Sequence, residues 1–222
     1  MQLRSLLEGI IASRHLLDHP FYQRWSAGEL TLDELREYAR QYWHFTHAFP
    51  TFVSGIHANA NEIAVRQLLL ENLIEEERGP ENHPELWLRF CEALGLSRDE
   101  VTASEPTEAT REAIATLREL TRQGDTHEGL AALFAYEAQV PAVAKAKIEG
   151  LAKWYAIAEP RDVAFFSVHE VADVHHSQTA IEILERLCDD PAKAREAEDA
   201  AQASVDALYR FLDGVTAPMM VN

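Results

Sequence analysis

Helical periodicity runs through almost the whole of this 222-residue chain and limits what it can fold into. Apolar side chains recur every three or four residues, which places them on one face of an α-helix, and no stretch shows the alternation of a β-strand. Glycine and proline, which interrupt helices, number only nine each. The pattern predicts one all-α domain over residues 1–222, with roughly eight to ten helices joined by short loops.

Capping residues and prolines divide this pattern into helices. Thr31 followed by Glu34 is the signature of a capping box at the start of a helix. Pro50 is expected to bend or break that helix, and Pro141 to kink a later, longer one, because proline cannot donate a backbone hydrogen bond. Pro160 suits the first turn of the helix that follows it.

Composition and charge exclude several classes of function. The formal net charge is −17 and no basic stripe is visible, so nucleic acid is not an expected partner. No apolar run approaches the length of ~18 residues that a membrane-spanning helix needs. Two cysteines, Cys91 and Cys188, are too few for a disulfide framework and fit a reducing compartment. With an N-terminus that lacks the features of a signal peptide, the chain is expected to be cytoplasmic.

The segment HEVADVHH, residues 169–176, concentrates titratable side chains in eight positions. On an α-helix, His169, Asp173 and His176 fall within an arc of about 60°, whereas His175 points elsewhere. His169, Asp173 and His176 therefore lie within the apolar stripe of the helix and not on its solvent-exposed face. Because an ionised carboxylate buried without a partner is costly, this face predicts a compensating partner.

Other helices repeat the same anomaly. Glu137 lies at the centre of an apolar helix face, Glu76 continues a buried stripe, and His83 shares its face with large apolar side chains. The neighbours Glu75 and Glu77 are turned about 100° away and should be solvated. For one helix alone, a hydrogen-bonded histidine–aspartate pair in the core is an equal explanation. Four helical segments that each point polar side chains inward favour a shared site.

The chemistry of these six side chains indicates a metal centre. Three imidazoles and three carboxylates without a thiolate favour iron or manganese over structural zinc or an iron–sulfur cluster. Six ligands are too many for one catalytic ion with open positions but suit two ions bridged by carboxylates. The ligand types do not distinguish an iron pair, a manganese pair or a mixed pair. Glu76 and His83 are separated by Gly79–Pro80, which departs from the Glu-x-x-His pattern of ferritin-like bundles.

Three segments carry a resemblance to a known family: LIEEERGPENHPELW, AALFAYEAQVPAVAKAK and FFSVHEVADVHH. They resemble the heme-oxygenase-like di-iron proteins of the TenA/PqqC-like fold. More narrowly, they are similar to the branch named for the chlamydial protein associating with death domains (CADD). The similarity runs through most of the chain. It implies a compact bundle of about seven or more helices around a central cavity, with metal ligands Glu76, His83, Glu137, His169, Asp173 and His176.

The resemblance also implies a reaction, the synthesis of p-aminobenzoate for folate. In this branch the proposed chemistry is self-sacrificing and uses dioxygen and an external reductant. A tyrosine of the protein becomes the aromatic ring and a lysine supplies the amino group; by motif these are Tyr22 and Lys147. Lys147 lies roughly 80° from Glu137, at the edge of the same apolar face, where desolvation would favour a neutral amine. Alternatively, Tyr22 packs in the core and Lys145 or Lys147 is solvated.

Several other functions remain open at this stage. A di-iron oxygenase acting on a free small molecule would use the same six ligands. A TenA-like hydrolase needs a cysteine nucleophile, but Cys91 and Cys188 lie off the polar stripes; a PqqC-like oxidase needs a basic cavity, but the inward faces are acidic. A death-domain-binding protein would use its acidic surface to dock a basic partner. A homodimer is the assembly to expect if the chain oligomerises.

Overall fold

The computed structural model describes residues 3–216, except for the side chains of residues 171, 172, 174 and 175. This part of the chain contains eleven α-helices, one short 3-10 helix and no β-strand. The elements are α1 (Leu3–Ser13), η1 (Leu16–Asp18), α2 (Pro20–Ala27), α3 (Leu32–Asn59), α4 (Ile63–Glu77), α5 (His83–Ala93), α6 (Arg98–Thr102), α7 (Glu108–Arg122), α8 (Thr126–Glu137), α9 (Val140–Tyr155), α10 (Ala164–Leu187) and α11 (Pro191–Thr216). The all-α prediction is confirmed.

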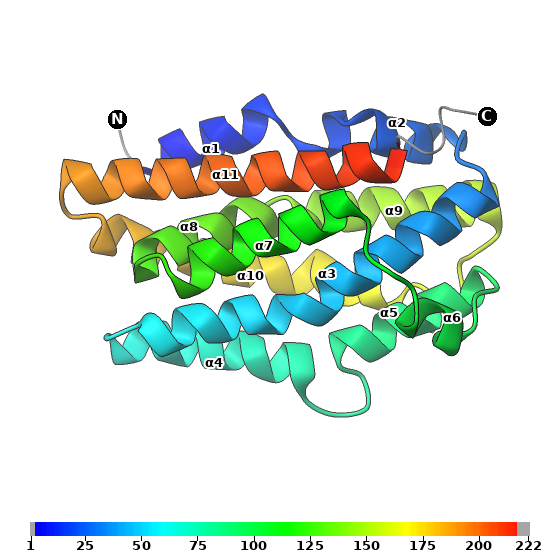
Figure 1. Cartoon of the computed structure of the whole chain (residues 1–222), viewed down its shortest axis with the longest axis horizontal. Helices are drawn as coiled ribbons and strands as arrows, with labels where there is room; N and C mark the ends of the chain where they lie inside the picture. The colour runs from blue at the N-terminus through cyan, green and yellow to red at the C-terminus, as the bar shows by residue number, and fades with distance from the viewer. Residues whose placement is uncertain (1–2, 217–222) are drawn as a thin grey trace.

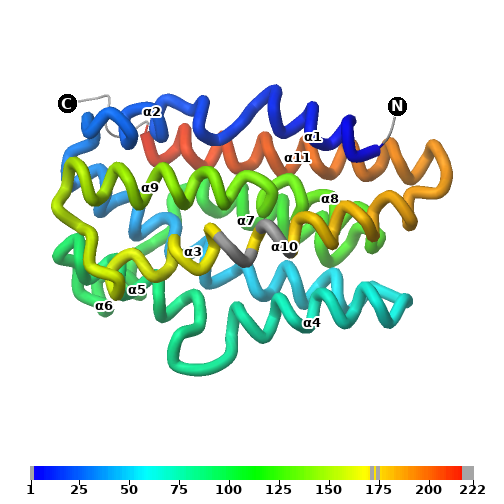
Figure 2. Tube along the Cα trace, turned by 180° about the vertical axis from the view of Figure 1, so that it is seen from behind, coloured from blue at the N-terminus to red at the C-terminus, as the bar shows by residue number. Residues whose placement is uncertain are grey.

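The long helices run side by side along the longest axis of the molecule (Figure 1). Helices α1, α2 and α11 form one edge of the bundle and α4, α5 and α6 form the opposite edge, an arrangement that both views show (Figures 1 and 2). Between these edges, α10 packs against α4, α5, α8 and α9. The helix that carries HEVADVHH therefore contacts each of the other helices with an inward polar residue.

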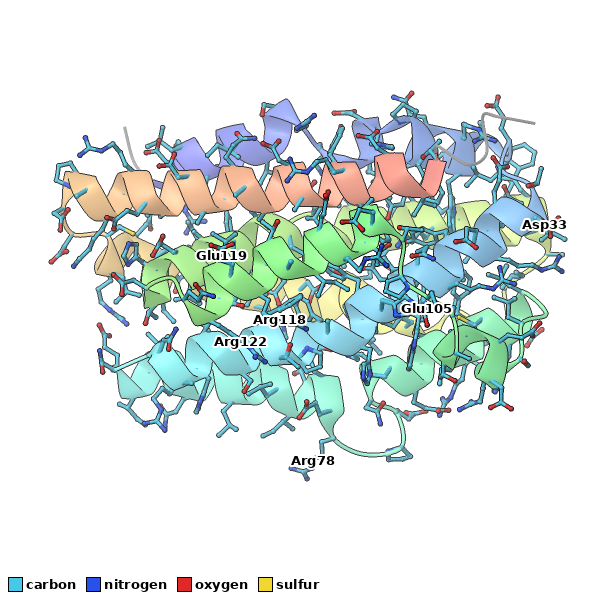
Figure 3. The ribbon with its side chains drawn as sticks, viewed as in Figure 1. Asp33, Arg78, Glu105, Arg118, Glu119 and Arg122 are labelled. Atoms are coloured by element: carbon cyan, nitrogen blue, oxygen red, sulfur yellow. The ribbon has the colours of Figure 1, made fainter. Side chains whose placement is uncertain are left out.

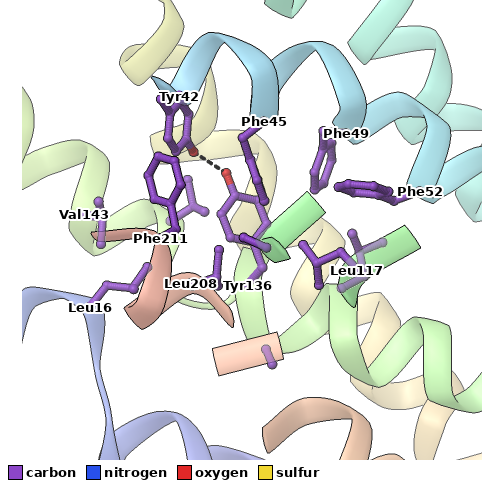
Figure 4. Close-up of a cluster of buried hydrophobic side chains, with 14 of the residues drawn as sticks. Leu16, Tyr42, Phe45, Phe49, Phe52, Leu117, Tyr136, Val143, Leu208 and Phe211 are labelled. Carbon is purple, nitrogen blue, oxygen red and sulfur yellow. Dashed lines mark hydrogen bonds between the residues drawn. The ribbon is translucent and has the colours of Figure 1, made fainter. Parts of the chain in front are cut away.

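Aromatic side chains fill the centre of the bundle. Tyr42, Phe45 and Phe49 of α3 pack against Tyr136 of α8, and Phe211 of α11 closes the cluster (Figure 4). All five are buried. Burial of apolar area at about 25 cal/mol per Å² makes a cluster of this kind the main source of stability in a helical bundle.

The three prolines differ from the predictions: α3 is not broken at Pro50, Pro141 lies in the first turn of a separate helix, and Pro160 precedes α10. Helix α3 continues through Pro50, because the buried Phe49, Phe52 and Val53 on both sides of the proline hold the helix against the core. The long helix expected around Pro141 is divided into α8 and α9. Pro141 has no N–H to bond back to the preceding turn, so it occupies the first turn of α9 instead of kinking one helix.

The start of α10 differs from the prediction, and the structure contains one short helix that was not predicted. Pro160 lies in the turn before α10 rather than in its first turn. The short helix α6, which the periodicity did not reveal, begins with a capping box between Ser97 and Glu100. The capping box of Thr31 and Glu34 at the start of α3 is present as predicted. Helix α6 and the division of the long helix bring the number of α-helices to eleven.

Charged side chains project from the outer surface of the bundle. Arg78 at the end of α4, Asp33 in the first turn of α3 and Arg118 of α7 are labelled examples (Figure 3). Within residues 3–216, none of the helices combines the length and the apolar character that crossing a membrane requires.

The core makes a direct prediction for stability. Trp87 is fully buried, and its indole N–H donates to the Ala39 carbonyl at 2.9 Å. Trp87→Ala should lower the free energy of unfolding by about 3–5 kcal/mol, because it leaves a cavity and removes the hydrogen bond of the indole. Ile63→Ala, at a position that is 66% exposed, should change it by less than about 0.5 kcal/mol. Urea unfolding monitored by circular dichroism measures both; equal losses would contradict this assignment of the core.

Candidate metal centre

The six predicted ligands come from four helices and are all buried. Glu76 lies in the last turn of α4, His83 begins α5, and Glu137 ends α8, whereas the other three lie on α10. In the turn from α4 to α5, Gly79 adopts a φ of 87°, a conformation that glycine permits, and Asn82 caps α5. This turn brings the His83 Nδ1 atom to 2.8 Å from Glu76 Oε1.

The side chains form two groups of three. One oxygen or nitrogen atom from each member of a group lies within 4.8 Å of the corresponding atoms of the other two members. The first triad consists of Glu76, His83 and His169; the second triad consists of Glu137, Asp173 and His176. Each triad combines carboxylate and imidazole groups, which is a ligand set for one iron or manganese ion.

In the first triad the imidazoles lie against each other. The ring centroids of His83 and His169 are 4.3 Å apart. His169 Nδ1 lies 2.6 Å from the Phe165 carbonyl oxygen and donates to it, which leaves Nε2 unprotonated, as a metal ligand must be. Burial lowers the pKa of His169. Burial also opposes charging His83, but the Glu76 carboxylate outweighs it and raises the pKa of His83.

In the second triad, the charge of each group changes the pKa of its neighbours. Burial and the charge of Asp173 raise the pKa of Glu137 to about 8, although the Asn72 side-chain amide donates to Glu137 Oε1 at 2.9 Å. Burial opposes charging His176, but a hydrogen bond to Asp173 and the charge of Glu137 raise its pKa to about 9. Acids this close together inside a core require positive charge, from protons or from a metal cation.

One ligand atom is left without a hydrogen-bond partner within the described structure. Asp173 Oδ2 is buried and makes no hydrogen bond of acceptable geometry. His83 Nδ1 also lacks hydrogen-bond geometry, but it lies 2.8 Å from the Glu76 carboxylate. Since buried polar atoms almost always have a partner, Asp173 Oδ2 fits a site built for a cation in the second triad.

Two residues near the second triad were missed or misplaced by sequence reasoning. Asn72 lies one turn before Glu76 on the same face of α4, a spacing that would have identified it as a supporting residue. Glu75, which was expected to be solvated, is 47% exposed, yet its Oε2 lies 3.3 Å from His176 Nε2. Glu77 is exposed as predicted. The side chain of His175 lies outside the described residues.

The structure also brings Tyr22 and Lys147 together. Both are buried, so the alternative in which Lys147 is solvated is wrong. Lys147 Nζ donates to the Tyr38 hydroxyl at 2.7 Å, and the Tyr38 and Tyr22 hydroxyl oxygens are 3.3 Å apart. Burial lowers the pKa of Lys147 to about 7 and raises the pKa of Tyr22. Tyr38, which sequence reasoning did not single out, connects the amine and the phenol.

An apolar cavity joins this pair to the first triad. Its walls include Tyr22 and Lys147 together with His169, Tyr42 and Tyr136. The Tyr42 and Tyr136 hydroxyl oxygens are 2.5 Å apart and share a hydrogen bond (Figure 4). The phenol, the amine and a candidate metal ligand therefore open onto one space from which most water is excluded.

The cysteines do not contribute to this site. Cys91 is fully buried in the core, where burial raises the pKa of its thiol to about 12. Burial also raises the pKa of Cys188, to about 11. Both remain protonated thiols at neutral pH, which makes them poor nucleophiles.

Comparison with known proteins gives close relatives over nearly the whole length. The chain is 43% identical over 221 residues to a 4-aminobenzoate synthase of Nitrosomonas europaea, covering 96% of this chain and 90% of the relative. It is 41% identical over 219 residues to a 4-aminobenzoate synthase of Chlamydia muridarum, covering 98% of this chain and 92% of the relative.

A solved structure confirms the predicted fold. A domain of unknown function with a heme oxygenase-like fold from Shewanella denitrificans superposes with a TM-score of 0.77 at 19% identity, covering 99% of this chain and 90% of that one. The TENA/THI-4/PQQC family profile matches residues 4–217. Together with the relatives above, this match establishes that the chain belongs to the TENA/THI-4/PQQC family.

Proposed function

We propose that this protein is a 4-aminobenzoate synthase that uses its own side chains as substrate. Tyr22 supplies the aromatic ring and Lys147 the amino group, with dioxygen as co-substrate and electrons from an external reductant. The observation that carries the proposal is the buried hydrogen-bonded chain Lys147–Tyr38–Tyr22, which shares a cavity with His169 of the first triad. The names of the relatives from Nitrosomonas and Chlamydia support it.

Two metal ions, iron or manganese, would be held by the two triads. Bound there, they would supply the activation of dioxygen that the reaction requires. The protein groups have distinct tasks around them. The Phe165 carbonyl and the Asn72 amide orient His169 and Glu137, and the surrounding aromatic rings exclude water.

The Lys147 amine is prepared for its role by its surroundings. A neutral amine has a lone pair and an ammonium does not, so a pKa near 7 makes Lys147 a usable nitrogen donor at neutral pH. Tyr38 accepts a hydrogen bond from the amine and holds it 5.4 Å from the centre of the Tyr22 ring. The phenol of Tyr22 remains protonated because burial raises its pKa.

The metal sites lead to a first prediction. Glu137→Ala removes one carboxylate of the second triad, so the purified protein should lose at least one of about two metal equivalents. Glu77→Ala alters an exposed acid on α4 and should retain both. Elemental analysis of protein purified without oxygen measures the content. Full metal content in Glu137→Ala would show that the second triad is not a metal site.

Self-sacrifice leads to a second prediction, which also separates it from an oxygenase acting on a free molecule. After anaerobic loading with iron and manganese, exposure to oxygen and a reductant should lower the intact mass and release at most one 4-aminobenzoate per chain. Tyr22→Phe should abolish both changes, whereas Tyr155→Phe, at a half-buried tyrosine of α9, should preserve them. Many turnovers with an unchanged protein mass would instead identify a free substrate.

The pKa of Lys147 leads to a third prediction. With a pKa of about 7, the Lys147 amine is charged only below that pH and loses its proton between about pH 6 and pH 8. The single-turnover yield of 4-aminobenzoate should therefore rise over this range. Lys147→Met should abolish the product at every pH. Lys145→Met, at an exposed lysine on the same helix, should keep the wild-type profile. A pH-independent yield would rule out the neutral amine as the controlling group.

A further inference from the structure

A second, smaller cavity lies between the two triads, and we refer to it as the chamber. Carboxylate or imidazole groups of both triads line it, and aromatic rings close it on the side of α3. Its wall consists of Phe45, Thr46, Phe49, Glu76, Tyr136, Glu137, Phe165, His169 and Asp173. The rings leave room only for a small molecule, and a ligand in the chamber would lie next to side chains of both triads.

Thr46 contributes the one aliphatic hydroxyl to this wall. The residue is 4% exposed, and its Oγ1 atom is buried without a hydrogen-bond partner in the described part of the chain. Leaving a buried hydroxyl unpaired is costly, because the group has lost its water and gained nothing in return. An unpaired hydroxyl in a cavity wall is therefore expected to have a partner that enters the cavity.

Other helical threonines show that this lack of a partner is not imposed by the helix. Their hydroxyls donate to a carbonyl three or four residues earlier, at distances of 2.6 to 3.0 Å, as seen at Thr51, Thr102, Thr116, Thr121 and Thr216. That bond is available to any threonine in a helix through rotation of its side chain. Thr46 does not make it, so its hydroxyl remains free for a ligand in the chamber.

The other polar groups of the chamber either belong to the triads, where Asp173 Oδ2 also lacks a hydrogen-bond partner, or are paired with another side chain. The carboxylates and the imidazole belong to the triads, and the Tyr136 hydroxyl is paired with Tyr42 at 2.5 Å (Figure 4). Among the lining residues, Thr46 is the hydroxyl without a protein partner. A hydroxyl donates to electron-rich atoms, so its partner is a small ligand that carries negative charge or lone pairs.

We propose that Thr46 is a ligand-binding residue of the chamber, which donates a hydrogen bond to a small electron-rich molecule held between the two triads. Dioxygen, or an anion of similar size, belongs to this class. The proposal rests on the proposed function, because the ligand needs metal ions in the triads to hold it. Thr46 fixes the orientation of the ligand on the α3 side, and the rings of Phe45 and Phe49 restrict its size.

Azide binding to the oxidised, metal-loaded protein tests this directly, because azide is a small anion that accepts hydrogen bonds. Thr46→Val keeps the shape of the side chain and removes the hydroxyl, so the azide Kd should weaken roughly ten-fold or more, as expected for a lost hydrogen bond to a charged group. Thr46→Ser keeps the hydroxyl and should bind azide within about three-fold of the wild type. An optical titration measures the three affinities.

A second measurement needs no metal and separates a functional hydroxyl from a structural one. In the metal-free protein, Thr46→Val replaces an unpaired buried hydroxyl with a methyl group, so its melting temperature should rise by roughly 2–4 °C. A lower melting temperature would show that the hydroxyl stabilises the fold and would overturn the proposal. Unchanged azide affinity in Thr46→Val would also overturn it.

The metal content distinguishes failure of this inference from failure of the proposed function. A wild-type protein that takes up no iron or manganese contradicts both. Full metal content with unchanged azide affinity in Thr46→Val contradicts only the role of Thr46. Loss of metal from Thr46→Val also contradicts that role, because the hydroxyl would then support the triads rather than a separate ligand.

Discussion

The burial of three carboxylates and three imidazoles inside one helical core is the constraint on which the rest of the structure depends. Desolvation alone would make such a core unstable, and its effect is visible in the raised pKa of Glu137, where the charge of Asp173 adds to it. The pKa of His176 is also raised, because the hydrogen bond to Asp173 and the charge of Glu137 outweigh the effect of burial. Positive charge would therefore stabilise the two triads, and two metal cations could supply it without rearrangement of the side chains.

The same desolvation shifts the pKa values of Lys147 and Tyr22, which lie outside the triads. It lowers the pKa of Lys147 to about 7, so that a large share of the amine is neutral at neutral pH, and it raises the pKa of Tyr22, so that the phenol stays protonated. Helix α3 contributes to both parts of the site: Tyr38 accepts a hydrogen bond from the Lys147 amine, and Tyr42 lines the cavity that the pair shares with His169. One environment thus favours cations at the triads and excludes charge from the groups that would react.

The side chains in the core also distinguish this chain from enzymes that catalyse other reactions on the same fold. The two triads consist of acids and imidazoles. They do not form the basic cavity that a PqqC-like oxidase needs. The Cys91 thiol is buried in the hydrophobic core with a raised pKa and does not line the cavity of the phenol and the amine. The buried phenol and amine lie close together in this core, and the relatives that cover nearly the whole chain are named 4-aminobenzoate synthase.

The sequence by itself determined the helical fold and the inward direction of the six polar side chains, because the angle between residues on a helix depends only on local backbone geometry. It could not show that α3 passes through Pro50, or that Thr46 lines the cavity beside the triads. Those features arise from contacts between helices far apart in the chain, such as the link from Lys147 to Tyr38. Packing of distant helices decides such contacts, so only the tertiary structure reveals them.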